Sequence, residues 1–169
     1  PALDHPRAID TDAVDRRNRN PHSRVIISRD KVIGVTIDGQ ARAYPVRVLN
    51  WHEVVNDSLA GVPIAVTFSP ISRAAVVFDR RLGDQTLRFG FSGLVYPHNL
   101  VLHDRRDDPA DESLWPQLRF AAIAGPRAGA RLRVLPARLV QWGQWREAHP
   151  DTTLMLGRDA DAWQDRNER

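Results

Sequence analysis

Apolar positions along this chain come in short β-branched runs rather than in long helical stripes, and these runs begin near residue 25. Two of them, Val32–Ile37 and Ala41–Val46, flank the dipeptide Asp38-Gly39. Asp-Gly between two such runs is typical of a tight β-hairpin turn, whose central residues need positive φ. We therefore predict that Lys31–Asp38 pairs with Gln40–Val46.

The same pattern of short runs and turn residues continues through the middle of the chain. His52–Ser58 and Val62–Phe68 flank a Leu-Ala-Gly turn, and Ala74–Arg80 and Gln85–Phe89 flank a turn that contains Gly83. Further extended segments are expected at 99–104, 113–118, 120–124, 131–135 and 152–156, with a short helical turn within 45–51. Short strands separated by turns predict a mainly antiparallel sheet.

One segment has the periodicity of a helix. In Val140–His149 the apolar Trp142 and Trp145 are three residues apart, and Pro150 follows the segment and ends it. We therefore predict an α+β fold that is mainly β: an antiparallel sheet or partly closed barrel, with a helix near the C-terminus.

The length of 169 residues fits a single domain, and an apolar fraction of 42% suits a packed core. Residues 1–24 carry alternating charges with little periodicity, so we expect an irregular N-terminal arm there. We expect one globular domain over residues 25–156 and a polar tail over 157–169.

The charge pattern indicates a solvated surface. The net charge is +3, Lys31 is the single lysine among 24 basic residues, and acids are interleaved with bases, as in Asp104–Asp108. A nucleic-acid-binding protein usually concentrates its basic residues on one face, so no nucleic-acid partner is predicted.

No apolar run approaches the roughly 20 residues of a membrane helix, so we expect a soluble chain without a membrane span. The chain begins at Pro1 rather than at Met, so the lack of a signal sequence leaves cytoplasmic and extracytoplasmic locations open. The oligomeric state also stays open.

The absence of cysteine removes disulfides, thiolate metal ligands and cysteine nucleophiles together. If the chain has a metal cofactor, His52, His98 and His103 are the candidate ligands. His98 and His103 are five residues apart, which places them on opposite faces of a regular strand. They would share a metal only if the chain bends at Pro97.

Two segments come close to catalytic motifs. The segment 52–56, His-Glu-Val-Val-Asn, nearly matches the zinc-protease pattern H-E-x-x-H, but Asn56 stands where the second ligand belongs. Its two valines favour a strand, with His52 and Glu53 on opposite faces. The segment 90–94, Gly-Phe-Ser-Gly-Leu, lacks the last glycine of a nucleophile elbow and is interpreted as a tight turn.

Several segments together resemble the bacterial domain-of-unknown-function family 3179, in order and spacing from Pro1 to about Leu156. They are Pro1-Ala2-Leu3-Asp4, Gly39-Gln40-Ala41-Arg42-Ala43-Tyr44-Pro45, Asn50-Trp51-His52-Glu53-Val54-Val55-Asn56-Asp57, Ala75-Val76-Val77-Phe78-Asp79-Arg80, Ser92-Gly93-Leu94-Val95-Tyr96, Glu112-Ser113-Leu114-Trp115 and Trp142-Gly143-Gln144-Trp145.

The resemblance implies a Cys-Pro-Leu-Cys motif, in some members with selenocysteine, after the strand that ends here at Phe68. Such a pair suggests redox or soft-metal chemistry. This chain has Ser69 and Ser72 at the two positions, Arg73 where the family commonly has glycine, and Pro97-His98-Asn99 in place of Asn-Ser-Asn. Changes at Arg73 and His98 favour natural divergence over deliberate replacement of two cysteines.

These departures point to a pocket that has lost its thiols. The expected ligand-binding residues are Ser69, Ser72, Arg73, Asn99, Asp104 and Glu112, with His52 and His98 as candidate catalytic groups. Arg73 and His98 suit a small anionic ligand. A binding domain is the first hypothesis. The alternatives are an acid–base enzyme that uses His52 or His98, a His-based metal-dependent oxidoreductase, and a purely structural or interaction domain.

Overall fold

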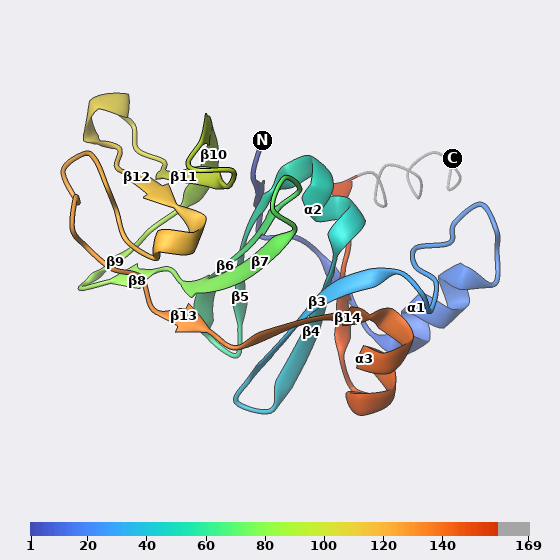
Figure 1. Ribbon diagram of the computed structural model, residues 1–169. Coiled ribbons are helices and arrows are strands. Elements are labelled where there is room, and N and C mark those ends of the chain that lie inside the picture. Colours follow the sequence, from blue (N-terminus) through green and yellow to red (C-terminus); the bar gives the residue numbers. More distant parts are fainter. Residues whose placement is uncertain (159–169) are drawn as a thin grey trace. The chain divides into compact units, whose positions relative to one another are not determined.

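The computed structural model describes residues 1–158, which form two compact units (Figure 1). Unit 1 combines Pro1–His5 with Leu49–Pro136, and unit 2 combines Pro6–Val48 with the chain from Ala137 onward. Each unit is therefore assembled from two separate stretches of sequence, whereas we expected one globular domain over residues 25–156. Of the expected polar tail, residues 159–169 lie outside the described part of the chain.

Unit 1 is built from two sheets and a short ribbon. One sheet has the order β1-β5-β6-β7-β13, the second has the order β10-β11-β12, and β8 pairs with β9. The elements are β1 (Leu3–Asp4), β5 (Val54–Leu59), β6 (Val62–Ser69), β7 (Ala74–Asp79), β8 (Arg81–Leu82), β9 (Gln85–Thr86), β10 (Phe89–Val95), β11 (Leu100–Asp104), η1 (Pro109–Asp111), β12 (Leu114–Pro116), η2 (Gln117–Arg119) and β13 (Val134–Leu135).

The core of unit 1 lies between its two sheets. Alternate residues of β7, β10 and β11 contribute to one apolar cluster, as the two-residue period of a strand requires, and β5, β6 and β12 add one residue each. The rings of Phe89 and Trp115 meet edge to face there, with centroids 5.8 Å apart. This core holds the turns at the strand ends in place.

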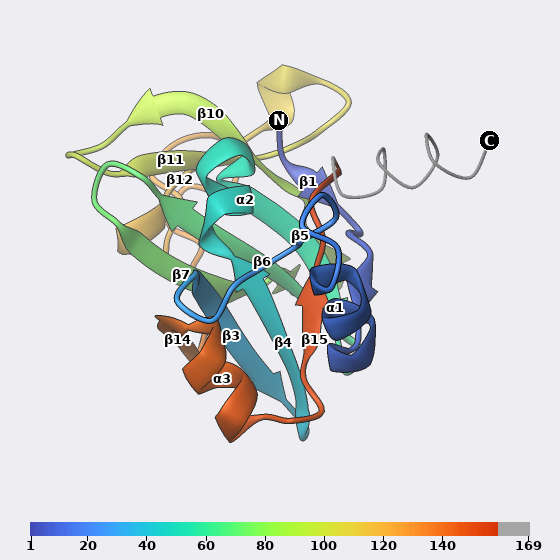
Figure 2. The same cartoon turned by 90° about the vertical axis from the view of Figure 1, so that its right-hand side faces the viewer.

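The described part of unit 2, up to residue 158, contains one sheet of the order β14-β3-β4-β15-β2 and the helices α1 and α3 (Figure 2). Its elements are β2 (Ala8–Ile9), α1 (Thr11–Asn18), β3 (Lys31–Ile37), β4 (Gln40–Pro45), β14 (Ala137–Gln141), α3 (Trp142–Ala148) and β15 (Thr153–Met155); α2 (Val46–His52) begins in unit 2 and ends in unit 1. Trp142 and Trp145 of α3 enter the core of this unit. Gly34 leaves the space for the Trp145 ring, which a Cβ at that position would clash with.

The predicted fold class is confirmed: the chain is mainly β, with a helix near residue 145. The Asp38-Gly39 hairpin is also confirmed, since β3 and β4 pair antiparallel up to Ile37 and Gln40. The sheets do not close into a barrel, and both five-stranded sheets are mixed, because β1 runs parallel to β5 and β15 runs parallel to β4.

Two local expectations differ from the structure. Residues 1–24 contain β1, β2 and α1 rather than an irregular arm; the Asp10 side chain caps α1 by accepting from the Ala13 amide at 2.7 Å. β7 does not pair with Gln85–Phe89, because it lies between β6 and β13 and its hydrogen bonds go there. None of the helices within residues 1–158 is long and apolar enough to cross a membrane.

Candidate functional site

The turn between β6 and β7 carries the two serines that replace the expected cysteines. β6 and β7 pair up to Ser69 and Ala74, so residues 70–73 form the connection. Ser69 is fully buried, whereas Ser72 and Arg73 are exposed. The Ser72 amide donates to Ser69 Oγ at 3.4 Å, which brings the two serine positions together. Arg73 adopts a left-handed backbone conformation with φ 55°.

A buried polar pair lies next to this turn. Gln117 Nε2 donates to Thr67 Oγ1 at 2.8 Å and to the carbonyl of Ala74, the partner of Ser69, at 3.1 Å. Gln117 Oε1 is buried and has no hydrogen-bond partner among the described residues. Gln117 was not among the predicted site residues, and no local sequence pattern marks it, because its role depends on contact between two sheets.

The His52-Glu53 segment connects α2 to β5 and does not form a strand as predicted. His52 ends α2, Glu53 takes a left-handed conformation with φ 58°, and β5 begins at Val54. The Glu53 carbonyl accepts from the Phe68 amide at 2.9 Å, so α2 ends beside the strand that leads to Ser69. His52 Nδ1 lies 2.9 Å from the Pro1 carbonyl oxygen. Burial raises the pKa of the Glu53 carboxyl.

The segment around His98 forms the turn between β10 and β11. The Tyr96 amide donates to the Asn99 carbonyl at 2.8 Å, and His98 is exposed, with φ 57°. Asn99 is buried, and its Oδ1 accepts from the Leu100 amide at 2.6 Å. Its Nδ2 has no partner within the described residues.

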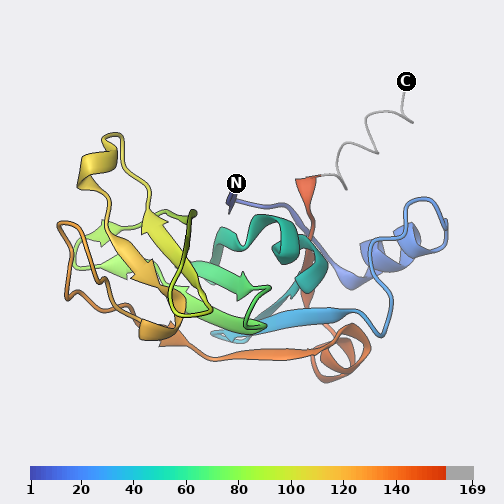
Figure 3. The same cartoon turned by 45° about the horizontal axis from the view of Figure 1, so that its top comes forward.

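The two turns lie on the same side of unit 1. In Figure 2 both are at the left edge, and in Figure 3 the green turn after β6 and the olive turn after β10 are again neighbours. The link between them is β12 and η2: β12 pairs with β11, and Gln117 at the start of η2 bonds to Ala74 at the start of β7. Segments 69–73 and 97–99 are therefore on one side of the unit, which the predicted site requires.

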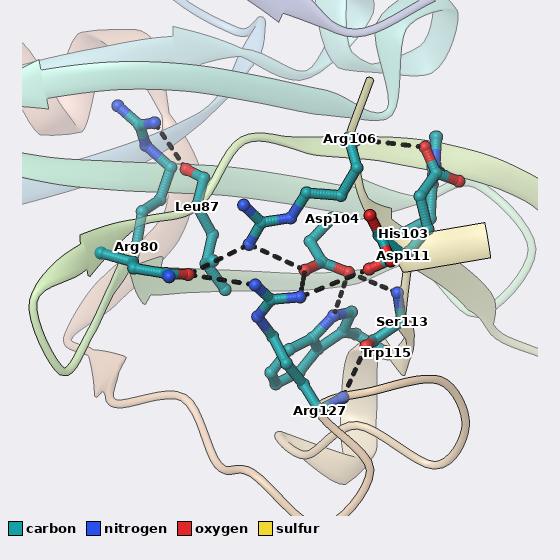
Figure 4. Close-up of polar contacts among 11 residues, drawn as sticks. Arg80, Leu87, His103, Asp104, Arg106, Asp111, Ser113, Trp115 and Arg127 are labelled. Atoms are coloured by element: carbon teal, nitrogen blue, oxygen red, sulfur yellow. Dashed lines mark hydrogen bonds and ion pairs between the residues drawn. The ribbon is translucent and has the colours of Figure 1, made fainter. Parts of the chain in front are cut away.

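Asp104 has a different environment from the one expected of a ligand-binding residue. Its side chain is 0% exposed. Oδ1 accepts from the Ser113 amide at 2.6 Å and from Trp115 Nε1 at 3.2 Å, and Oδ2 faces Arg106 at 3.3 Å and Arg127 at 3.0 Å (Figure 4). These four contacts use both carboxylate oxygens. Asp104 therefore connects three loop segments of unit 1.

Glu112 lies beside this network and orients a histidine. Glu112 Oε2 is 2.7 Å from His103 Nδ1, and its Oε1 accepts from the Arg106 amide at 3.3 Å. A Cβ at Gly90 would meet His103 Nε2, so the strand opposite the imidazole needs glycine. Asp104, Glu112 and His103 thus belong to one polar cluster, which is distinct in its contacts from the Ser69–Arg73 turn.

The comparison with known families agrees with the resemblance of the motifs. The family described as a protein of unknown function (DUF3179) matches residues 1–167. The chain belongs to this family. No curated protein and no solved structure matches it. For this DUF3179 member, function must therefore be argued from its own residues.

The structure does not bring the three candidate metal ligands of this DUF3179 chain together. Within residues 1–158 no group of three or more His, Asp or Glu side chains has an arrangement that could hold a metal ion. His52 is next to the Pro1 carbonyl, His98 is exposed in its turn, and His103 is paired with Glu112. This geometry therefore gives no support to the hypothesis of a metal site formed by the three histidines.

Asp4, in the first segment matched by the DUF3179 family, is held by two arginines and an amide. Its carboxylate accepts from Arg105, from Arg88 at 2.8 Å and from Asn56 Nδ2 at 2.8 Å. Burial by itself would raise the pKa of Asp4, but hydrogen bonds from Arg105, Arg88 and Asn56 outweigh it and hold the pKa well below its usual range.

This depressed pKa predicts a pH-dependent contribution to stability. At acidic pH values at which the unfolded chain already binds a proton at Asp4, the folded state keeps this carboxylate charged. Lowering the pH through this range therefore favours unfolding. We expect wild type to be more stable than Asp4→Asn at neutral pH. The difference should stay constant above the unfolded pKa of about 4 and shrink progressively below it. Urea unfolding of both proteins between about pH 7 and about pH 3 measures this, and a difference that grows on acidification would contradict the assignment.

Proposed function

We propose that this chain is a thiol-free binding domain of its family, with a small anion held at the turn Ser69–Arg73. The observation that supports this most directly is the conformation of Arg73. A left-handed backbone costs a non-glycine residue about 1–2 kcal/mol, and glycine, the residue the family resemblance implies here, would avoid that cost. The chain nevertheless has an arginine in this strained conformation, with an exposed side chain. This combination supports a binding role for the guanidinium.

His98 repeats this combination on the neighbouring turn. It also has positive φ and an exposed side chain, at a position where the resemblance implies serine. A guanidinium binds carboxylate or phosphate through two parallel hydrogen bonds, and the exposed Ser72 hydroxyl and the His98 ring can add donors. Both changes therefore add groups that suit an anion.

The buried serine fits binding better than catalysis. Ser69 is 0% exposed, so a ligand at the turn reaches Ser72 and Arg73 before it reaches Ser69. A serine hydroxyl also cannot form the disulfide or the thiolate–metal bond that the family's cysteines imply. The acid–base alternative with His52 or His98 stays a hypothesis, and Asp104 and Glu112 are not needed for the proposed site.

Arg73→Gly is the decisive variant for this proposal. The substitution relieves the backbone strain, so we expect unchanged or increased stability. It also removes the guanidinium, so we expect an at least tenfold weaker affinity for anions, which is about the effect of losing one charge-assisted hydrogen bond. The measurement is a titration of isotope-labelled protein with inorganic phosphate and with acetate, followed by NMR shifts of residues 70–73 and 97–99.

Arg131→Ala is the matched control, because Arg131 is another exposed arginine of unit 1. This variant should bind phosphate like wild type. If Arg73→Gly and wild type show the same affinity, or if neither anion shifts the signals of the two turns, the proposed function is wrong.

A further inference from the structure

We propose that the side of unit 1 around the Ser69–Arg73 turn is a docking surface for a lipid bilayer with anionic headgroups. The surface consists of exposed apolar side chains on two turns, at the end of β10, in η2 and near the end of α2. We call it the tip surface: Trp51, Ile71, Leu94, Val95, Tyr96 and Leu118. The inference rests on the proposed function, because Arg73 of that site supplies positive charge to this surface.

The first argument is the concentration of exposed apolar side chains. Nine large apolar residues are exposed among residues 1–158, and six of them belong to the tip surface. Trp51 is 83% exposed and Ile71 is 61% exposed. Single exposed apolar residues are normal, but a group of them on one side of a unit marks an interaction site.

The second argument is their placement. The turn with Ile71 and the turn after Tyr96 lie on the same side of unit 1 in Figures 2 and 3. Leu118 directly follows Gln117, whose side chain bonds to Ala74 at the end of the first turn. Trp51 is two residues before Glu53, whose carbonyl is bonded to Phe68 in β6. Segments far apart in sequence thus present their apolar residues near one another.

The third argument is charge. The segments 50–53, 70–73, 94–99 and 117–119 contain Arg73 and Arg119, both exposed, and the histidines 52 and 98. Glu53 is their single acidic residue, and its side chain is partly buried. The tip surface is therefore apolar and basic, and it complements an apolar partner with negative charges at its rim.

A bilayer fits this pattern better than a protein groove does. The apolar side chains project from several separate elements, not from one continuous helix or sheet face. A flat surface can meet several such projections at once. Trp and Tyr favour the membrane interface, since their rings are apolar and carry a polar edge. Arginine beside them gains from anionic lipid, and shallow insertion of this kind needs no spanning helix.

The experiment is flotation of the purified chain with vesicles of phosphatidylcholine alone and of phosphatidylcholine mixed with phosphatidylglycerol. We expect binding to the mixed vesicles, weakened by salt at about 0.5 M. Ile71→Ser and Arg73→Glu should each lower the partition coefficient roughly tenfold. Leu139→Ser and Arg138→Glu are the matched controls, because both residues are exposed on β14 of unit 2, and they should bind like wild type.

The outcomes separate this inference from the proposed function. Phosphate binding without vesicle binding would overturn the bilayer assignment and leave the anion site standing. Equal binding to both kinds of vesicle would overturn the role of the anionic headgroup. Concentration-dependent dimers in sedimentation velocity that Ile71→Ser abolishes, without vesicle binding, would assign the tip surface to a second copy of the chain instead.

Discussion

Replacing Asp104 by alanine is expected to lower the free energy of unfolding by about 3–5 kcal/mol, because it removes a buried carboxylate that pairs with two partly exposed arginines and accepts two buried hydrogen bonds. The substitution leaves Arg106 and Arg127 without their shared carboxylate and removes the acceptor of the Ser113 amide and of Trp115 Nε1. A buried donor that has lost its acceptor destabilises the folded state by the full free energy of its desolvation. The β11 end, the 105–113 loop and the loop with Arg127 should loosen together.

Asp104→Asn separates charge from hydrogen bonding. Its amide oxygen can still accept from the Ser113 amide, so we expect a smaller loss than for alanine, about half. Asp107→Ala is the control, since Asp107 is exposed in the loop that follows β11, and it should change stability by less than about 0.5 kcal/mol. Urea unfolding followed by the fluorescence of the buried Trp115 is the measurement. Near-equal stability of Asp104→Ala and wild type would show that the network is not structural.

The features that were predicted correctly from the sequence depend on neighbours along the chain. The Asp38-Gly39 turn fixes its hairpin locally, and the spacing of Trp142 and Trp145 specifies one face of α3. The features that were missed depend on distant partners. β7 has the composition of a hairpin strand, but its second neighbour is β13, more than 50 residues later. The pairing of β1 with β5 likewise joins residue 3 to residue 55, and nothing near residue 3 indicates it.

The candidate site remains a prediction. The resemblance to the family indicated Ser69, Ser72, Arg73 and His98, and the segments that contain them lie at the ends of two pairs of strands in unit 1. Residue type alone could not tell that Asp104 is enclosed by arginines, because acids and bases alternate along its segment. An acidic side chain in a charged loop is usually solvated, and only the fold shows that this one is fully buried.

At least one of the many arginines has a structural role that the composition could not reveal. We interpreted the arginines as a solvated surface, yet Arg80 is 3% exposed and its guanidinium donates to the carbonyls of Ile64, Leu87 and Asp57. Burial lowers the pKa of Arg80. The planar guanidinium can serve three carbonyls at once, which a lysine ammonium does with less directional control. At least one arginine is therefore structural and does not belong to the solvated surface.

Restoring cysteine at Ser69 and Ser72 is expected to give this chain the thiol pair that the family resemblance implies. The Ser72 amide already lies 3.4 Å from Ser69 Oγ, so the two side chains start from one tight turn. On treatment with oxidised glutathione, the two thiols should give up two protons and two electrons and form one intramolecular disulfide. Mass spectrometry should then show a loss of about 2 Da and no free thiol, whereas a single-cysteine variant has no second thiol with which to lose these 2 Da.

The two sulfurs of the restored pair should differ strongly in reactivity, because position 69 is fully buried and position 72 is exposed. A thiol reacts as thiolate and only where the reagent reaches it. Ser72→Cys should therefore react with iodoacetamide about as fast as Ser28→Cys, an exposed reference in unit 2. Ser69→Cys should react roughly 100-fold more slowly, since its reaction waits for local opening. Equal rates at 69 and 72 would contradict the buried position of Ser69. The predicted asymmetry means that, in a thiol-bearing version of this turn, the thiol at position 72 would react first with a reagent from solvent, whereas the thiol at position 69 would react only after local opening.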